Sequence, residues 1–373
     1  MEMLKELLKS LDYKEYSQVE YKSKSSSVNY QDILRELADG YNIEELPERG
    51  IKPENLEIFK RDLADNNLTV ENLKAINQYS NGSNMILGVK RNLVEKSTIR
   101  QNIHTQLNES LQARGLNKET IDNISNYIND LDYSKPLHEN YDILRNNIDS
   151  LDLPGSSKAS MFTATKNMNN LNHIDETINS LDDALSKSYI NESVKVYRAL
   201  KGVPEESLTN MVGKSFNNKG YTSTTPVYES SFAKYDEYNT VIEMNIPKGT
   251  QGIDITRFSD YDSVENEILL NDNDLTVFET KKGIIDKNEK SKNIIKGYAL
   301  SKDRSGYENL EEKNMLINKS DTNAQSFKEQ LKTSVCIQEE ITKNYIAREQ
   351  EQLQQQIQPS IEQTQIDMGG RQL

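Results

Sequence analysis

The sequence predicts an α+β protein in which a helical half precedes a strand-rich half. From Leu63 to Leu185, apolar residues recur every three or four positions, the spacing that places them on one face of a helix. After Asn191 the pattern changes to short runs of β-branched and aromatic residues bounded by Gly, Pro or Asn-Asp turns, which is typical of strands. A run of helices followed by a run of strands favours an α+β domain over alternating βαβ units.

Composition limits what the chain does. Only 35% of its 373 residues are hydrophobic and 28% are charged, so we expect part of the chain to lie outside a packed core. The net charge of -14 argues against a nucleic-acid partner, because nucleic-acid binding depends on basic groups. The single cysteine, Cys336, excludes an intramolecular disulfide and a multi-cysteine zinc site, and the three histidines are scattered, so no metal is expected.

Residues 1–65 are predicted to form a short helical N-terminal module. Leu4, Leu7, Leu8 and Leu11 give one apolar stripe, and a second periodic run spans residues 30–37 before a proline-rich stop. The start of the chain has no uninterrupted apolar segment, and no run approaches the length of a membrane span. The sequence therefore predicts a protein without a Sec signal, either cytoplasmic or exported by another route.

Within the helical half, three stretches show the clearest helical spacing. They are residues 73–79, 121–131 and 174–185. Turn-forming clusters at residues 80–83 and 153–157 are expected to separate helices.

Seven runs in the second half are predicted strands. They cover residues 194–200, 220–225, 240–246, 252–255, 266–270, 275–278 and 294–300. Neither a Gly-x-Gly-x-x-Gly segment nor a Walker-type loop occurs, so the two common phosphate-binding loops are absent from the sequence. Residues 303–373 are polar and rich in Glu and Gln, and we expect a partly disordered extension. The alternative is a tag read by secretion machinery or another partner.

Glu265 and Glu267 stand two positions apart at the start of an apolar run. In a strand, alternate side chains share a face, so both carboxylates would point the same way. Alternating glutamates also occur on ordinary solvated strand faces. Taken alone, Arg198 could be a surface arginine on an edge strand, and Ser223 could belong to a strand end.

Together, these residues lie in three of five ordered segments that resemble the mono-ADP-ribosyltransferase family, in the Arg/Ser/Glu-x-Glu branch that includes clostridial binary toxins. The segments are residues 75–83 (similar to A-I-x-x-Y-T-G-S, one residue longer), 194–200 (V-Y-R-G), 213–225 (G-x-x-F-x-x-x-G-F-x-S-T-S), 246–250 (V-P-K-G-T) and 261–270 (Y-x-x-E-x-E-x-L-L, one residue longer). The resemblance covers about residues 66–302. It departs from the family pattern at Ala199, at Thr225 and at Lys234, the nearest cation where the family has an Arg, and these changes bear on cofactor affinity.

The resemblance implies a strand-rich two-sheet catalytic domain that uses NAD as co-substrate and needs no metal. Cleavage of the bond between nicotinamide and ribose passes through an oxocarbenium-like transition state, which a fixed carboxylate stabilises. By resemblance Glu267 is that carboxylate, Ser223 orients it, and Arg198 holds the NAD phosphates or the adjoining ribose. Thr224 is a further candidate for cofactor binding. Phe232 either stacks on nicotinamide or packs in the core.

The resemblance also implies which group accepts the ADP-ribose. A Glu at position 265 goes with arginine acceptors in the family, because a carboxylate can dock a guanidinium and take its proton. Phe258 and Tyr261 are candidates for contact with the target protein, or for packing. The expected partner is thus a protein bearing an acceptor arginine.

Two alternatives stay open: an NAD glycohydrolase, which transfers to water, and a catalytically inactive fold that serves as a binding module. The expected location is outside the producing cell or in a host cell, with cytoplasmic as the alternative.

Overall fold

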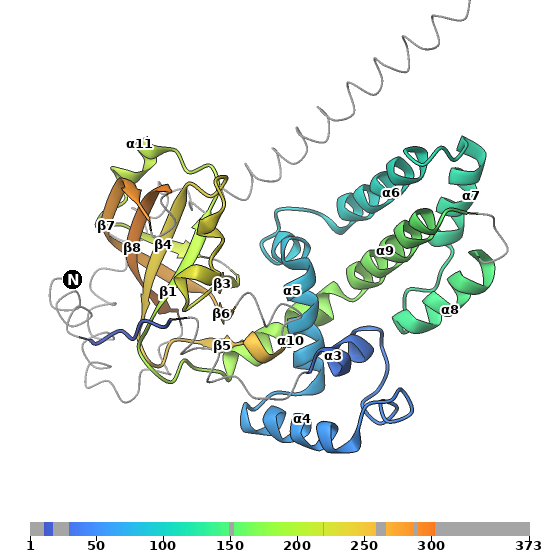
Figure 1. Ribbon diagram of the computed structural model, residues 1–373, viewed down its shortest axis with the longest axis horizontal. Helices are drawn as coiled ribbons and strands as arrows, with labels where there is room; N and C mark the ends of the chain where they lie inside the picture. Colours follow the sequence, from blue (N-terminus) through green and yellow to red (C-terminus); the bar gives the residue numbers. More distant parts are fainter. Residues whose placement is uncertain are drawn as a thin grey trace, which may run out of the picture.

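The computed structural model has the predicted α+β fold, with helices first and two β-sheets after them (Figure 1). It describes residues 11–17, 30–148, 153–218, 220–258, 266–286 and 290–302. Most of the predicted first helix, the C-terminal extension, Tyr261 and Glu265 lie outside these residues. Within the described ranges, none of the helices has the length and apolar character needed to cross a membrane.

Helix α10 (Ile174–Ser186) packs against one of the sheets, α5 (Val70–Lys90) packs against α10, and α3 (Gln31–Ala38) packs against α5. Helix α4 (Pro53–Asp65) follows α3 in the chain. Helix α5 begins with a reciprocal cap, in which the Thr69 hydroxyl accepts from Asn72 N at 3.1 Å and the Asn72 side chain accepts from Thr69 N at 3.0 Å. The amide of Asn72 also donates to Ser180 O at 2.8 Å, so the same residue ties α5 to α10.

The turn expected at residues 80–83 is a kink instead. Helical structure continues on both sides of Gly82, whose backbone leaves the helical region at φ -152° and ψ 34°. Glycine permits this local break without a side-chain clash, and the flanking turns stay in one element because both halves bury apolar residues.

Four further helices extend away from the sheets in Figure 1. They are α6 (Lys96–Gln112), α7 (Lys118–Asn129), α8 (Leu137–Ile148) and α9 (Gly155–Asn172). Helix α9 packs against both α6 and α8, and Asn117 caps α7 by accepting from Thr120 N. The predicted turn at residues 153–157 is in part the first turn of α9.

Five strands form a mixed sheet in the order β1-β4-β8-β7-β2, and β4 and β8 are its parallel pair. The strands are β1 (Val194–Leu200), β2 (Ser215–Asn218), β4 (Thr240–Ile246), β7 (Asn273–Ile285) and β8 (Ser291–Ser301); the short helix α11 (Glu205–Leu208) follows β1. Strand β2 was not predicted, because Ser-Phe-Asn-Asn has little strand propensity and is extended through its pairing with β7.

The second sheet is antiparallel, with the order β3-β6-β5. Its strands are β3 (Thr222–Thr224), β5 (Gly252–Asp254) and β6 (Ile268–Leu270). One face packs on the large sheet through Ile268 and Leu270, and the other packs on the helices through Leu269. The small sheet therefore lies between the large sheet and the helices (Figure 1).

Helices α3 and α4 share their apolar core with the rest of the helical part. Tyr30, just before α3, packs edge-on against Phe59 of α4 and stacks on Phe258 at a ring distance of 6.1 Å. The predicted division at residue 65 therefore runs through one continuous core, and the division into three domains stays a prediction.

Candidate active site

The two sheets are joined where the Arg and Ser motifs meet. Tyr197 N donates to Thr225 O at 2.7 Å, and Thr225 N donates back to Tyr197 O at 3.0 Å. This pair places the next residue of β1, Arg198, beside β3, and Arg198 Nη1 donates to Ser223 O at 3.1 Å. Two motifs that are 25 positions apart in the chain are thereby in direct contact.

Glu267 lies directly before β6 and is 6% exposed. Its carbonyl accepts from Ile255 N at 2.9 Å, so the chain is still paired at this position. Strand alternation places Glu267 on the same face as Leu269, which faces the helices and is paired with Ser223. Asn266 has a different partner, because its side-chain amide donates to Ser230 Oγ at 2.8 Å.

Glu267, Arg198 and Tyr79 of α5 form one electrostatic group. Burial raises the pKa of Tyr79, and the Glu267 carboxylate raises it further, whereas Arg198 and Arg91 lower it. Burial of the guanidinium lowers the pKa of Arg198, against the opposing influence of Tyr79 and Glu267. The Tyr79 phenol is therefore neutral beside a carboxylate and two guanidinium groups.

Arg91 belongs to this group, although none of the sequence motifs includes it. It directly follows α5, its Nη2 lies 3.5 Å from Tyr221 O, and its charge lowers the pKa of Arg198. Gly220 leaves room for it: a Cβ at this position would lie 3.3 Å from Arg91 Nε, and the backbone has φ +86°. Arg91 and Arg198 are two cations that repel each other. An anion between them would be attracted by both, so the pair is suited to bind an anion.

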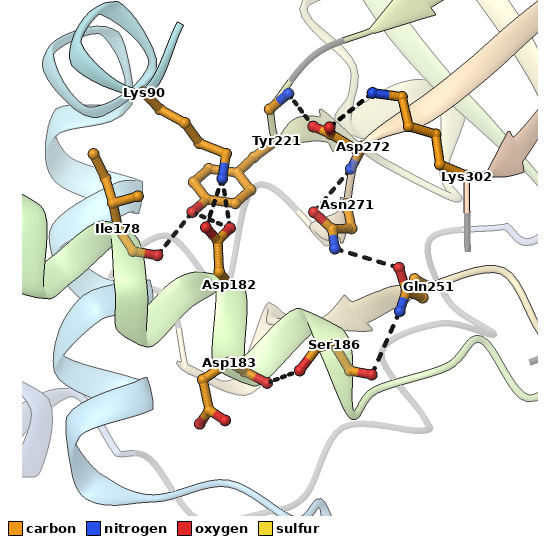
Figure 2. A network of polar contacts seen from close by, with 11 residues as sticks. Lys90, Ile178, Asp182, Asp183, Ser186, Tyr221, Gln251, Asn271, Asp272 and Lys302 are labelled. Atoms are coloured by element: carbon orange, nitrogen blue, oxygen red, sulfur yellow. Dashed lines mark hydrogen bonds and ion pairs between the residues drawn. The ribbon is translucent and has the colours of Figure 1, made fainter. Parts of the chain in front are cut away.

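A polar network holds this arrangement between helices and sheet (Figure 2). Tyr221, two residues before Ser223, donates its hydroxyl to Asp182 Oδ1 at 2.8 Å and to Ile178 O at 3.0 Å, both in α10. Lys90 Nζ pairs with the same carboxylate and lies 4.6 Å from the centre of the Tyr221 ring. Helices α5 and α10 are thus both attached to the entry of β3.

The other end of the network fixes the turn before β7. Asp272 accepts from Gly220 N and pairs with Lys302 Nζ at 2.9 Å. Asn271 donates to Gln251 Oε1 at 3.3 Å, and Gln251 reaches Ser186 O at the end of α10 (Figure 2). The entry of β3 is therefore held both to α10 and to the turn before β7.

Phe232 lies at the surface and not in the core, with 43% of its surface exposed. It opens the short helix η2 (Phe232–Lys234), which follows η1 (Tyr228–Ser230) and packs against β1. The next residue, Ala233, is buried beside Tyr197, so the backbone is attached to β1 while the Phe232 ring stays accessible. The side chain of Lys234 lies outside what the structure describes.

Two of the candidate site residues lie in the interior. Thr224 alternates with Ser223, so it faces the core between the sheets, and its hydroxyl donates to Ile268 O at 2.8 Å. Phe258, in the short helix η3 (Thr256–Phe258), is 2% exposed and stacks on Tyr30, so it packs in the helical core and is not at a surface open to a target protein.

Ser223 contacts Arg198 through its carbonyl, and no hydrogen bond from its hydroxyl to Glu267 is seen. The structure thus groups Arg198, Ser223 and Glu267 and leaves Glu265 and Tyr261 outside the described residues. Across those residues, no group of three His, Cys, Asp or Glu side chains could hold a metal ion.

Residues 161–302 match the family model described as ADP-ribosyltransferase exoenzyme. This segment contains all eight strands of the two sheets, Arg198, Ser223 and Glu267. The match to this family model therefore lies in the strand-rich part of the chain.

Solved structures of bacterial ADP-ribosylating toxins are similar to this chain. C3stau2 from S. aureus, solved with NAD, is 23% identical, covers 35% of this chain and 73% of its own, and has a TM-score of 0.30. Plx2a from Paenibacillus larvae is 18% identical over 56% of this chain and 98% of its own, with a TM-score of 0.31. The C3 exoenzyme of Clostridium limosum is 13% identical over 75% and 98%, with a TM-score of 0.33. No curated protein sequence matches the chain.

Proposed function

We propose that this protein is an NAD-dependent mono-ADP-ribosyltransferase that transfers ADP-ribose to an arginine of a target protein and releases nicotinamide. The observation that carries the proposal is the buried Glu267 carboxylate, which is grouped electrostatically with Arg198 and Tyr79 on the face that looks toward α5. The exoenzyme domain at residues 161–302 and the NAD in the C3stau2 structure support NAD as co-substrate.

The carboxylate suits the bond that must break. As nicotinamide leaves, the ribose ring gains positive charge at its anomeric carbon, and a fixed negative charge beside it lowers the barrier. Glu267 is held by the backbone bond from Ile255, so it requires little reorganisation at the moment of reaction. In this proposal its carboxylate accepts from a ribose hydroxyl and stabilises the cation.

The two arginines suit the pyrophosphate of NAD. A pyrophosphate carries two negative charges, and Arg91 lies close enough to Arg198 to lower the pKa of its guanidinium. Planar guanidinium groups bind phosphate oxygens through paired hydrogen bonds. In this chain they take the place of the glycine-rich loops that are missing from its sequence. Ser223 then acts by fixing Arg198 through its carbonyl.

Conversion of Glu267 to Gln tests the proposal. Glu267→Gln keeps the shape and removes the charge, so we expect nicotinamide release and transfer of labelled ADP-ribose to lysate proteins to fall by at least about 100-fold. Nicotinamide is measured by chromatography, and transfer is measured with NAD labelled in the adenylate part. The absence of both activities in the wild type would contradict the proposal and favour the binding module.

Glu243→Gln is the matched control. Glu243 lies on β4 and pairs with Lys296, which keeps a second carboxylate partner in Glu279. We expect both activities of this variant to stay within about twofold of wild type, because partly exposed ion pairs contribute little. An equal loss in the control and in Glu267→Gln would show that the effect arises from the fold.

The choice of acceptor is tested at Glu265. In the proposal Glu265 docks the acceptor guanidinium and takes its proton, whereas NAD cleavage itself depends on Glu267. Glu265→Gln is therefore expected to lower transfer to a small guanidino compound by at least about 100-fold and to change acceptor-free nicotinamide release by less than about threefold. Loss of both activities in parallel would contradict the division of roles. Release that is unaffected by any guanidino acceptor in the wild type would favour an NAD glycohydrolase.

The location and the remaining partners are also proposals. We propose that the protein acts in a host cell after secretion or injection, and that the C-terminal extension contacts secretion machinery or another partner. Fusion of residues 303–373 to a reporter, expressed in the producing cell, tests whether this segment directs export.

A further inference from the structure

Lys292 is a buried charge that the proposed chemistry does not use. Among the charged residues whose exposure the structure describes, Lys292 and Glu267 are the least exposed, and Lys292 is 2% exposed. It is the second residue of β8, the strand that pairs in parallel with β4. Burial of an ammonium group is unfavourable unless its donors are satisfied, so its partners identify its role.

Those partners belong to the segment that follows Phe232. Lys292 Nζ donates to Tyr238 O at 2.6 Å and to Tyr235 O at 3.0 Å. The same two residues close a turn, because Tyr238 N donates to Tyr235 O at 3.2 Å. The next residue along the strand also holds the segment, since Asn293 N donates to Asn239 O at 2.8 Å. One end of β8 thus fixes both sides of the turn.

Two aromatic rings of the turn stack with the Phe232 ring that precedes it. We call these three rings the aromatic shelf: Phe232, Tyr235 and Tyr238. The Phe232 ring lies 5.5 Å from the Tyr238 ring at 18° and 6.2 Å from the Tyr235 ring at 28°. Phe232 and Tyr235 are 43% and 46% exposed, so the shelf has an open side. Lys201 Nζ lies 4.7 Å from the centre of the Tyr238 ring.

The aromatic shelf lies beside the Arg198 group. Helix η2 packs against β1, and Ala233 packs against Tyr197, the neighbour of Arg198. Tyr238 is also close enough to Arg198 to affect the pKa of its guanidinium. A flat cationic ring such as nicotinamide binds well against an aromatic face.

We infer that Lys292 is a positioning residue of the NAD site: its buried ammonium fixes the turn at residues 235–238 and thereby holds the aromatic shelf in place to receive the nicotinamide ring. The kinetic part of this inference rests on the proposed function. In this proposal Lys292 does not contact the substrate. It acts through Tyr235 and Tyr238 and through the Phe232 ring that stacks with theirs.

Lys292→Met tests the inference, because methionine fills a similar volume and cannot donate. In the full chain without ligand, hydrogen exchange of the amides in residues 231–239 should become at least about tenfold faster. In the assay of nicotinamide release, the KM for NAD should rise about tenfold while kcat changes less than about threefold.

Lys290→Met is the matched control, since Lys290 reaches the same turn through an exposed ion pair with Asp236. Loss of that exposed pair should change both exchange and KM by less than about twofold. Unchanged exchange and KM in Lys292→Met, or equal effects in both variants, would overturn the inference.

A double-mutant cycle separates positioning from general stability. In a Phe232→Ala background the central ring of the shelf is gone, so the additional Lys292→Met change should raise KM by less than about twofold. An undiminished tenfold effect in that background would show that Lys292 acts through the whole fold and would overturn the inference.

If Lys292→Met melts too low for assay, Lys292→Gln, whose shorter and uncharged side chain keeps an NH2 donor group, should show the same effects at smaller amplitude. Absence of these effects in a folded Lys292→Gln variant would also overturn the inference. If the wild-type protein releases no nicotinamide, only the proposed function is contradicted. The hydrogen-exchange measurement still decides whether Lys292 fixes the turn.

Discussion

Arg91 and Tyr79 show how single residues far along the chain from Arg198, Ser223 and Glu267 become part of the site. Tyr79 lies in the segment that resembles the first family helix, yet nothing in the sequence connects its phenol with Glu267. In the structure, Glu267 raises the pKa of Tyr79, and Arg91 and Arg198 lower it. The site therefore contains at least two more groups than the Arg, Ser and Glu motifs predict.

At the scale of single residues, we predict the effect of Arg91→Met on the KM for NAD. A charge-assisted hydrogen bond to a phosphate contributes about 1.5–3 kcal/mol, so its loss should raise the KM for NAD by about 10- to 100-fold. The kcat of nicotinamide release should fall much less, because the charge of the pyrophosphate does not change when the bond between nicotinamide and ribose breaks. Steady-state measurements at varied NAD concentration give both values.

Arg114→Met is the corresponding control. Arg114 follows α6 and donates to Ser110 on the preceding turn, in the helical part that extends away from the sheets. We expect no change in KM beyond about twofold, as for other exposed surface substitutions. An unchanged KM in Arg91→Met would exclude Arg91 from cofactor binding.

Among the elements, β3 depends most on its neighbours. It has three residues and carries Ser223, and α5, α10 and the turn before β7 all bind its entry through Tyr221, Gly220 and Asp272 (Figure 2). A strand this short has little stability of its own. Its position is therefore decided by the side chains of other elements.

Tyr221→Phe tests that dependence. The ring and its packing remain, but the hydrogen bonds to Asp182 and Ile178 O are lost. We expect the free energy of unfolding to fall by about 1–2 kcal/mol, measured by urea denaturation followed by circular dichroism. Burial raises the pKa of Tyr221, so its hydroxyl stays protonated and this loss should not depend on pH below about 9.

Tyr127→Phe provides the comparison, because Tyr127 also donates to a helix carbonyl, Ile143 O, but at an exposed position. Its loss should lower the free energy of unfolding by less than about 0.5 kcal/mol. Equal losses in the two variants would contradict the special role of Tyr221 at the entry of β3.

At the scale of the whole molecule, one apolar core joins the N-terminal helices, the longer helices and one face of the small sheet. Phe258 stacks on Tyr30 in this core, and Leu269 packs into it from β6. The second core lies between the two sheets. Because β6 contributes to both cores, the residues around Glu267 are fixed from two sides.

Much of this architecture could be predicted from sequence. Residues 194–200 and 240–246 were predicted as strands and are β1 and β4, because β-branched runs between turns are a local signal. The strand predicted at 275–278 is β7, which spans residues 273–285, since pairing with β8 extends it into a polar segment. Propensity alone does not indicate such an extension.

The sequence by itself determined the α+β order, the sheet-forming runs and the ordered motifs that carry Arg198, Ser223 and Glu267, because periodicity and motifs are properties of neighbouring residues. Only the tertiary structure decided that Arg91 and Tyr79 join these residues, that Thr224 and Phe258 face the interior, and that Lys292 holds the aromatic shelf. The physical reason is that burial, charge coupling and strand register depend on contacts between distant parts of the chain. No local pattern encodes those contacts.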